Sequence, residues 1–126
     1  MQLAATVMTW EDSDGVAMLG FADQLYDTGE YFLIQFSEEV TDEEVETGLD
    51  KNYLEINGKA TYGVMERVDI YNDRIEVTFD SKTALRISSG EMLRIDYRLV
   101  PMERDEIQRR FVAVSSEVGT VVTLHP

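Results

Sequence analysis

The sequence of 126 residues contains no cysteine, a single histidine and two prolines. The absence of cysteine excludes disulfides, thiolate metal sites and a cysteine nucleophile. Because the one histidine, His125, is next to the last residue, we expect no Ser-His-Asp triad, multi-histidine zinc site or histidine acid–base catalysis, and we expect His125 to be solvated. No segment approaches the roughly 18 consecutive apolar residues of a membrane span. The sequence therefore predicts a protein that is not an enzyme and that uses no metal or other cofactor.

Positive charge is missing from the first two-fifths of the chain. Residues 1–50 carry 13 acidic residues and no lysine or arginine, whereas residues 51–126 carry 12 acidic and 11 basic residues. The two parts have net charges of −13 and −1, so nearly the whole net charge of −14 belongs to the first part. This charge repels nucleic acids and anionic membranes but attracts a basic protein. We therefore expect a basic protein partner, no nucleic acid and no membrane.

The length and the apolar fraction of 44% suffice for one domain with an ordinary hydrophobic core. No repeat, low-complexity tract or linker divides the chain, and we expect a single domain over residues 1–126. The first ten residues lack the positive and apolar regions of a signal peptide. We therefore expect a cytoplasmic protein.

Alternating apolar residues predict many strands. The dipeptide Asn57-Gly58 favours a type I′ hairpin turn, and residues 11–15 favour another turn. The nearly continuous apolar run 30–36 is typical of a central strand that is covered on both faces. We expect about seven or eight strands, drawn from the segments 3–10, 16–22, 30–36, 53–57, 59–64, 65–71, 74–79, 92–99 and 121–124.

Helical patterns occur in the second half of the chain. Asp80 or Ser81 can cap a helix over 81–88, and apolar residues at i, i+4 and i+7 predict a helix over 103–114. In 38–51 a capping-box pattern favours a short helix or turn, although the same residues also alternate as in a strand. The predicted class is α+β, a mostly antiparallel β-sheet with two or three short helices packed on it.

The acidic residues match no specific catalytic or metal-binding spacing. Asp12-Ser13-Asp14-Gly15 departs from an EF-hand loop, and no glycine-rich phosphate-binding loop occurs. A carboxylate-based hydrolase or a calcium module remains an alternative. Most tyrosines are expected in the core or in cross-strand pairs. Tyr26 is different because acids flank its loop, where it either anchors an interface or folds back onto the sheet.

Short motifs in the central part of the chain follow one another in an informative order. They are Gly20–Asp23, Glu30–Gln35, Gly48–Asp50, Tyr53–Asn57, Tyr62-Gly63, Arg74–Val77 and Leu93–Ile95. Their order and spacing over about residues 18–98 resemble the immunity protein 10 (Imm10) family of bacterial polymorphic-toxin systems. The resemblance implies a small, non-catalytic cytosolic protein that binds a cognate toxin domain and blocks its active site or its access to substrate.

The resemblance and the charge suggest the same kind of partner. Many antibacterial toxins attack nucleic acids and present basic substrate surfaces, which an acidic protein can occupy as a phosphate mimic. We therefore expect an immunity protein that neutralises a cognate toxin, such as a nuclease, through an acidic surface. The residues predicted to form that surface are Asp23, Tyr26, Asp27, Glu38, Glu39, Asp42, Glu43, Glu44, Glu46 and Asp50.

A second hypothesis is a non-catalytic structural or oligomerising domain whose acidity only serves solubility. A self-complementary apolar edge strand would favour this hypothesis. Acidic side chains paired with the later arginines would argue against an acidic docking surface. Neither the identity of the toxin nor the oligomeric state follows from the sequence.

Overall fold

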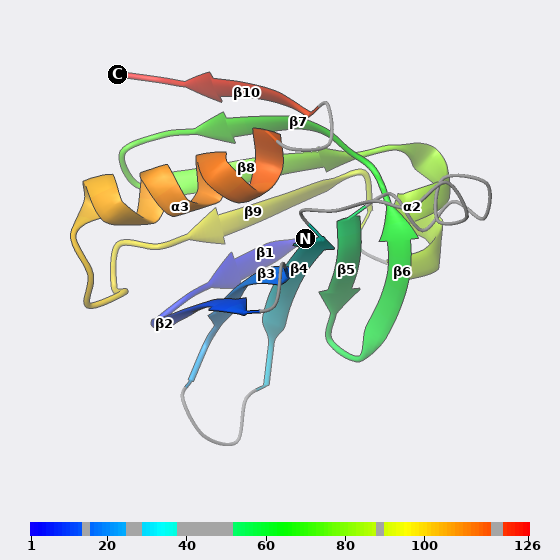
Figure 1. Ribbon diagram of the computed structural model, residues 1–126, viewed down its shortest axis with the longest axis horizontal. Helices are drawn as coiled ribbons and strands as arrows, with labels where there is room; N and C mark the ends of the chain where they lie inside the picture. The colour runs from blue at the N-terminus through cyan, green and yellow to red at the C-terminus, as the bar shows by residue number, and fades with distance from the viewer. Residues whose placement is uncertain (14–15, 25–28, 38–51, 88–89, 117–119) are drawn as a thin grey trace.

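The computed structural model describes residues 1–13, 16–24, 29–37, 52–87, 90–116 and 120–126. These residues form ten strands and two helices (Figure 1), which confirms the α+β class. The strands are β1 (Gln2–Ala4), β2 (Val7–Ser13), β3 (Val16–Ala22), β4 (Tyr31–Ser37), β5 (Asn52–Ile56), β6 (Lys59–Gly63), β7 (Met65–Ile70), β8 (Arg74–Phe79), β9 (Met92–Asp96) and β10 (Val121–Leu124). The helices are α2 (Ser81–Ile87) and α3 (Arg104–Ser116), close to the two helices predicted after residue 80.

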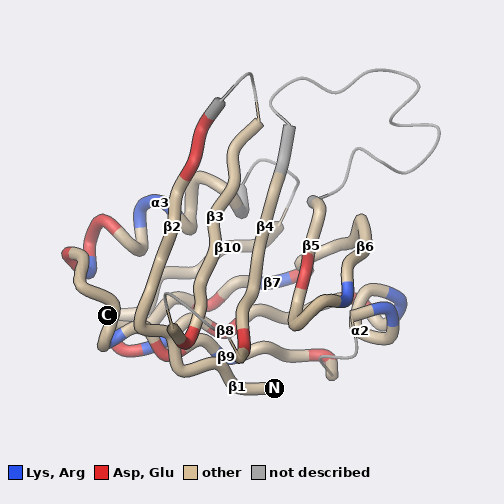
Figure 2. Tube along the Cα trace, turned by 90° about the horizontal axis from the view of Figure 1, so that it is seen from below, with Lys and Arg blue, Asp and Glu red and all other residues tan. Residues whose placement is uncertain are grey.

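The strands divide between two five-stranded sheets instead of forming the one sheet that we expected. The meander sheet has the order β2-β3-β4-β5-β6 and is antiparallel throughout. The mixed sheet has the order β1-β9-β8-β7-β10, with β1 and β10 parallel to their neighbours. Figure 2 shows that the strands of the meander sheet run across those of the mixed sheet.

The turns of the meander sheet follow local chemistry. Asn57 and Gly58 have positive φ angles of 50° and 87°, as the two central residues of a type I′ turn require, and they join β5 to β6. The turn expected over 11–15 is wrong for residues 11–13, because β2 continues to Ser13, which pairs with Val16, whereas residues 14 and 15 lie outside the described residues. The polar end of β2 is tolerated because β2 is an edge strand with a solvent-facing side.

The segment predicted as one strand over 3–10 is in fact two strands in different sheets. The Ala5 N–H donates to the Asp96 carbonyl at 2.9 Å, whereas the Thr6 N–H donates to the Ala22 carbonyl, also at 2.9 Å. The chain therefore changes partners between residues 5 and 6. This exchange carries the chain from the mixed sheet into the meander sheet.

The core lies between the two sheets and is closed by α3. Helix α3 contacts β3 and β4 of the meander sheet and β7 and β10 of the mixed sheet. The Phe21 and Phe111 ring centroids lie 6.0 Å apart, and those of Phe32 and Phe79 lie 6.2 Å apart in an edge-to-face arrangement. These contacts join strands of both sheets and the helix into one apolar cluster.

Helix α2 is attached to the end of the meander sheet. Asp80 caps it as predicted, because its carboxylate Oδ1 accepts a hydrogen bond from the Thr83 N–H at 2.8 Å. The Thr83 side chain is buried and its Oγ1 accepts a hydrogen bond from the Val64 N–H at 3.0 Å. This contact holds α2 against β6, at the point where Gly63 leaves space for the threonine.

Candidate partner-binding surface

Of the predicted surface residues, the structure describes only Asp23. Its Oδ1 accepts a hydrogen bond from the Gly29 N–H at 3.1 Å, and its carbonyl accepts one from the Thr6 hydroxyl at 2.7 Å. Asp23 thus helps to close the connection between β3 and β4. The remaining predicted residues lie outside the described residues: Tyr26, Asp27, Glu38, Glu39, Asp42, Glu43, Glu44, Glu46 and Asp50.

The two connections that contain these predicted residues, 25–28 and 38–51, join β4 at its opposite ends. Residues 25–28 connect β3 to the start of β4, whereas residues 38–51 connect the end of β4 to β5. Ser13, the last residue of β2, pairs with Val16 of β3, and Val16 pairs with Ser37, the last residue of β4. The end of β2 therefore lies at the same end of the sheet as the end of β4, which precedes 38–51. The acidic Glu11 and Asp12 therefore lie toward that end.

The outer face of the meander sheet is mostly apolar and aromatic. On β4 the buried residues Phe32 and Ile34 point into the core, while the alternating residues Tyr31, Leu33 and Gln35 point outward and are half-buried. The apolar run of β4 is thus central, as predicted, but the described elements cover only one of its faces. The outward side chains of β2 to β5 are Val7, Thr9, Glu11, Val16, Met18, Ala22, Tyr31, Leu33, Gln35, Tyr53 and Glu55.

Ion pairs are distributed unequally between the sheets. Those between described side chains all join residues in the range 67–125, on the mixed sheet, its connections and α3. Arg74, for example, contacts Asp73 at 2.9 Å and Glu76 at 3.1 Å. Strands β2 to β5 contain acidic residues and no lysine or arginine (Figure 2). Within the described ranges, the arginines that form ion pairs are thus paired with later acids, and they are Arg67, Arg74, Arg98, Arg109 and Arg110.

A group of tyrosines surrounds one carboxylate on the outer face of the meander sheet. The Tyr53 hydroxyl donates to Glu55 Oε1 at 2.7 Å, and the Tyr31 hydroxyl donates to Glu55 Oε2. The Tyr31 oxygen in turn accepts a hydrogen bond from the Gly58 N–H at 2.9 Å. Tyr62, which is 41% exposed, packs edge-to-face on Tyr53 with centroids 5.6 Å apart. We call Tyr31, Tyr53, Glu55 and Tyr62 the tyrosine–carboxylate cluster.

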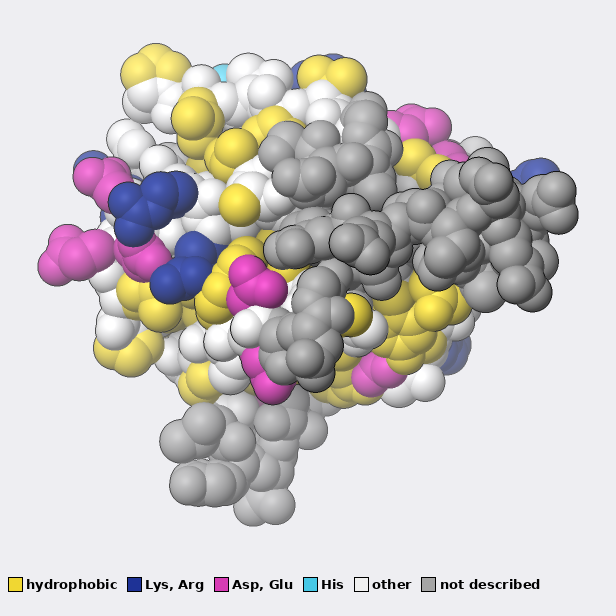
Figure 3. Space-filling model, viewed as in Figure 1, with side chains coloured by type: hydrophobic (Ala, Val, Ile, Leu, Met, Phe, Trp, Pro, Cys, Tyr) yellow, Lys and Arg dark blue, Asp and Glu magenta, His cyan; other side chains and the backbone are white. Residues whose placement is uncertain are grey.

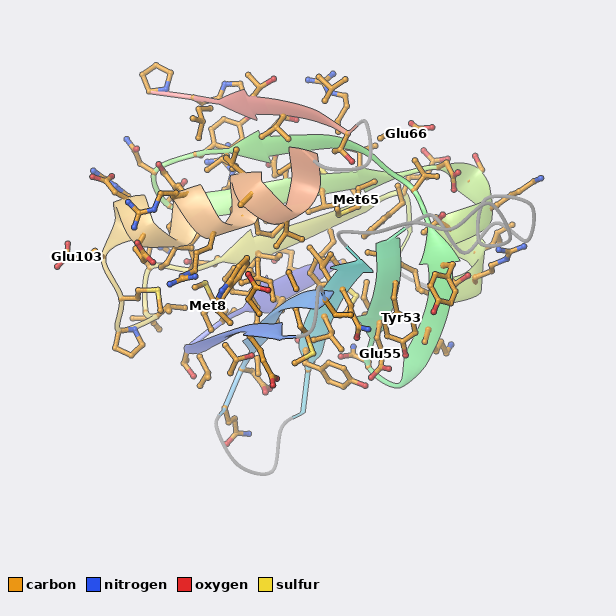
Figure 4. All side chains as sticks on the ribbon, viewed as in Figure 1. Met8, Tyr53, Glu55, Met65, Glu66 and Glu103 are labelled. Atoms are coloured by element: carbon orange, nitrogen blue, oxygen red, sulfur yellow. The ribbon has the colours of Figure 1, made fainter. Side chains whose placement is uncertain are left out.

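Strand register explains how the cluster forms. Tyr53 and Glu55 are two residues apart on β5 and therefore share a face. Tyr62 lies directly across from Tyr53 on β6, and Tyr31 lies diagonally across from Glu55 on β4. Figure 4 shows Tyr53 and Glu55 together beside β5 and β6, and Figure 3 shows hydrophobic side chains gathered there. The cluster is thus a product of the meander topology.

These hydrogen bonds change the acidity of all three groups that they join. The bonds donated by Tyr31 and Tyr53 hold the pKa of Glu55 below its ordinary value. The bond to Glu55, followed by desolvation, raises the pKa of Tyr53 to about 12 and also raises the pKa of Tyr31. At neutral pH the cluster therefore contains an ionised carboxylate between two neutral phenols.

The coupling predicts a particular response to alkali. The hydrogen bond from neutral Tyr53 to Glu55 stabilises the folded protein, and it raises the pKa of Tyr53 above the ordinary value of 10.0. This contribution to folding stability is complete below pH 10.0 and disappears as pH rises through about 12. For Glu55, whose pKa is lowered, stabilisation is present above the ordinary carboxyl pKa and disappears as pH falls through the lowered value. We expect Glu55→Gln to return the Tyr53 ionisation toward 10.0, measured by phenolate absorbance while circular dichroism monitors folding. Identical titrations of the folded wild type and variant would contradict the coupling.

A hollow of about 300 Å³ adjoins the cluster on the same face. Its apolar lining includes Val7, Ala22, Leu33 and the side of Tyr31. Gly20 keeps the floor open, because a Cβ there would lie 3.0 Å from Thr9 Oγ1 and 3.5 Å from Leu33 Cδ1. The size lies at the lower limit of about 300 Å³ for pockets that bind small molecules. It suits a side chain inserted by a partner.

The outer face of the mixed sheet has a different character. His125, expected to be solvated, is half-buried, with its Nε2 2.9 Å from Asp69 Oδ1 and its ring stacked on Tyr71 at 4.2 Å. The hydrogen bond from His125 is the main reason that the pKa of Asp69 is lowered. His125 and Asp69 thus join the end of β10 to β7, and the carboxylate of Asp69 has a hydrogen-bonding partner.

The tyrosine–carboxylate cluster is not among the residues predicted from the sequence to bind a partner. The sequence predicts most tyrosines in the core or in cross-strand pairs, and within the described cluster Tyr53 and Tyr62 form such a pair, whereas Tyr31 does not. A signal in the sequence is the spacing of Tyr53 and Glu55, which are two residues apart on the predicted strand 53–57 and therefore share a face. Among the described residues, no group of three His, Cys, Asp or Glu side chains could hold a metal ion. None of the described helices is long and apolar enough to cross a membrane.

Comparison with known protein families gives a match over most of the chain. The model of a family described as immunity protein 10 matches residues 3–105 of the chain. A search of curated proteins finds no match. The matched range contains the whole meander sheet and the strands β7, β8 and β9, whereas β10 and nearly all of α3 follow it.

Proposed function

The chain belongs to the immunity protein 10 family, and from this premise we propose that it binds a cognate bacterial toxin domain and neutralises it in the cytoplasm. An immunity protein acts by binding, and family membership therefore supports a partner-binding role without catalysis. The finer part of the proposal is that the toxin is basic and acts on nucleic acid. An acidic protein that covers the phosphate-binding surface of such a toxin excludes its substrate.

The unequal distribution of charge carries this proposal. Residues 1–50 have 13 acidic residues and no basic one, and the ion pairs of the described residues lie elsewhere. An acidic surface that is not neutralised within its own chain attracts a cationic partner and accelerates association. We propose that the acids of 38–50, with Asp23, Tyr26 and Asp27, contribute to this surface. The outer face of the meander sheet supplies apolar contacts between them.

Co-expression tests the function directly. The gene next to that of the immunity protein is expected to encode a protein that ends in a toxin domain. Cells that express this domain should survive only with the immunity protein, and the two proteins should purify together. Survival without the immunity protein, or no complex between the purified proteins, would refute the proposal. A stable homo-oligomer without any toxin complex would instead favour the structural alternative.

Charge reversal tests the acidic surface. We expect the double variant Glu43→Lys/Glu44→Lys to lower the association rate constant for the toxin by about tenfold at low salt, with a smaller change in the dissociation rate. The expected cause is loss of long-range attraction, which stopped-flow or surface-binding kinetics over a salt series would measure. Circular dichroism should show that the variant remains folded.

The matched control is Glu66→Lys/Glu91→Lys, which makes the same charge change at exposed positions after residue 50. Its effect on the association rate should be much smaller, because its charges lie outside the acidic part of the chain. Equal effects of the two double variants would show that only net charge matters. Association rates that do not vary with salt would remove electrostatic steering from the proposal.

A further inference from the structure

The apolar hollow and the tyrosine–carboxylate cluster are continuous, because Tyr31 belongs to both. One side of Tyr31 lines the hollow with Ala22 and Leu33, while its hydroxyl reaches Glu55. Leu33 pairs directly with Glu55 across β4 and β5. The meander sheet thus presents a space for an apolar side chain immediately beside an ionised carboxylate edged by aromatic rings.

We propose that this combined patch receives an arginine or lysine of the toxin at Glu55, with a neighbouring aliphatic side chain of the toxin seated in the hollow. The inference rests on the proposed function, since it names the chemistry of the toxin segment that the immunity protein recognises. It assigns to Glu55, Tyr31, Tyr53 and Tyr62 a binding role that lies outside the acidic segment 38–50.

The hydrogen-bonding capacity of Glu55 supports a cationic ligand. Each carboxylate oxygen accepts one tyrosine hydroxyl and has a further lone-pair direction for an N–H donor. The two hydroxyls hold the carboxylate in a fixed orientation, so a guanidinium or ammonium group would meet a preorganised acceptor. The aromatic rings of Tyr53 and the exposed Tyr62 add surfaces on which a cation or its aliphatic stem can pack.

Among the described strands of the meander sheet, the only basic residue is Lys59 on β6, which pairs with Ile56 rather than with Glu55. Strands β2 to β5 contain no lysine or arginine, and the structure gives Glu55 no ion pair within its described residues. On the mixed sheet, by contrast, Glu76 is paired with Arg74 and Asp96 with Arg98. A half-buried, hydrogen-bonded carboxylate of this kind gains most from a partner's cation that is desolvated on contact.

The same charges argue against other occupants. If a second copy docked with the same face, Glu11 and Glu55 of both copies would lie in one interface. Their negative charges would repel one another. Anionic membranes and nucleic acids are repelled by the same groups. A basic protein segment with an adjacent aliphatic residue is therefore the occupant that fits both halves of the patch.

The test compares toxin binding by the wild type, Glu55→Gln and a matched control, Glu66→Gln. Glu66 is an exposed carboxylate at β7, and Figure 4 shows it on the side of the molecule away from Glu55. We expect Glu55→Gln to weaken toxin affinity by about tenfold or more, mainly through faster dissociation, and Glu66→Gln to change it by less than about twofold. Calorimetry or surface-binding kinetics with the co-expressed toxin domain measures both.

A second variant guards against loss of the cluster's structure. Tyr62→Ala removes an exposed ring and leaves the hydrogen bonds of Glu55 in place, so its fold should survive and its toxin affinity should still fall. Thermal unfolding of each variant provides the check. Light scattering of the unbound protein tests for self-association. If the wild type self-associates and both Glu55→Gln and Tyr62→Ala abolish this, the patch binds a second copy of the chain, and the inference is overturned.

The outcomes separate this inference from the proposed function. If the wild type binds the toxin and both patch variants bind it as tightly, the proposed function stands and the inference fails. If the wild type neither binds nor protects, the proposed function fails and the inference fails with it. If binding falls in both patch variants but not in Glu66→Gln, the toxin's cation is assigned to Glu55.

Discussion

Phe111→Ala should lower the free energy of unfolding by about 3–5 kcal/mol, a large part of the 5–15 kcal/mol typical of natural domains. The Phe111 side chain is fully buried, and its ring meets Phe21 of β3 at a centroid distance of 6.0 Å. Truncation would remove this contact and leave a cavity at the place where α3 closes the space between the two sheets. Urea denaturation followed by circular dichroism measures the loss.

The control for this prediction is Leu85→Ala on α2, where the side chain is 81% exposed. Its effect should stay within about 0.5 kcal/mol, because little apolar surface is buried at this site. A loss below about 1 kcal/mol for Phe111→Ala would mean that α3 is not an integral part of the core. The comparison has a wider meaning because Phe111 follows the range 3–105 matched by the family model. A strong effect would show that the chain beyond that range completes the fold.

Gly63→Ala should also be strongly destabilising, by about 2–3 kcal/mol. A Cβ at this position would lie 2.5 Å from Thr83 Oγ1 and 2.6 Å from Thr83 Cγ2. Thr83 cannot easily move aside, because it is 2% exposed and its Oγ1 accepts the Val64 N–H. The clash would therefore push α2 away from β6 or break this hydrogen bond. Thermal and urea unfolding of the variant would show the loss.

The double variant Gly63→Ala/Thr83→Ser tests the stated cause. Serine keeps the hydroxyl that accepts from Val64 but removes the methyl group, so the double variant should regain part of the stability lost by Gly63→Ala. A double-mutant cycle gives the coupling between the two positions. Strictly additive effects would indicate that the cost of Gly63→Ala arises elsewhere.

Local signals in the sequence predicted several elements well. Asp80 caps α2 by the expected hydrogen bond, and Asn57-Gly58 forms the expected turn, because both depend on chemistry within a few residues. The α+β class also follows from alternation and periodicity, which are local properties. The ambiguous segment 38–51 lies outside the described residues, and its structure stays a prediction.

Features that depend on distant partners were not predictable in this way. The segment 3–10 is apolar apart from Thr6 and Thr9, so its composition gives no sign of the change of sheet at which Ala5 bonds to Asp96 and Thr6 bonds to Ala22. The apolar character of the run 30–36 shows that β4 is central but not that its outer side faces away from the described core. The exposure of a face depends on where the second sheet and α3 lie.

The candidate surface shows the same division. Counting residues predicts that positive charge is missing from the first 50 positions. It does not predict that Arg74 and Arg98 form ion pairs with acids close to them in sequence. Those ion pairs decide which acidic side chains have a basic partner within the described residues. The position of Glu55 between two phenols required the register of β4, β5 and β6, and this register follows from pairing between strands rather than from composition.

The way β1 joins the mixed sheet has a consequence for the order of folding. The Met1 amine donates to the Met92 carbonyl, 91 positions away, and β1 pairs with β9, whereas each ladder of the meander sheet joins strands that follow one another in the chain. Contacts between distant positions carry a larger loop-closure entropy and form later. During synthesis on the ribosome, β2 to β6 can therefore pair while β9 is still being translated. Strand β1, although it is synthesised before the meander sheet, is then among the last of these strands to reach its final position.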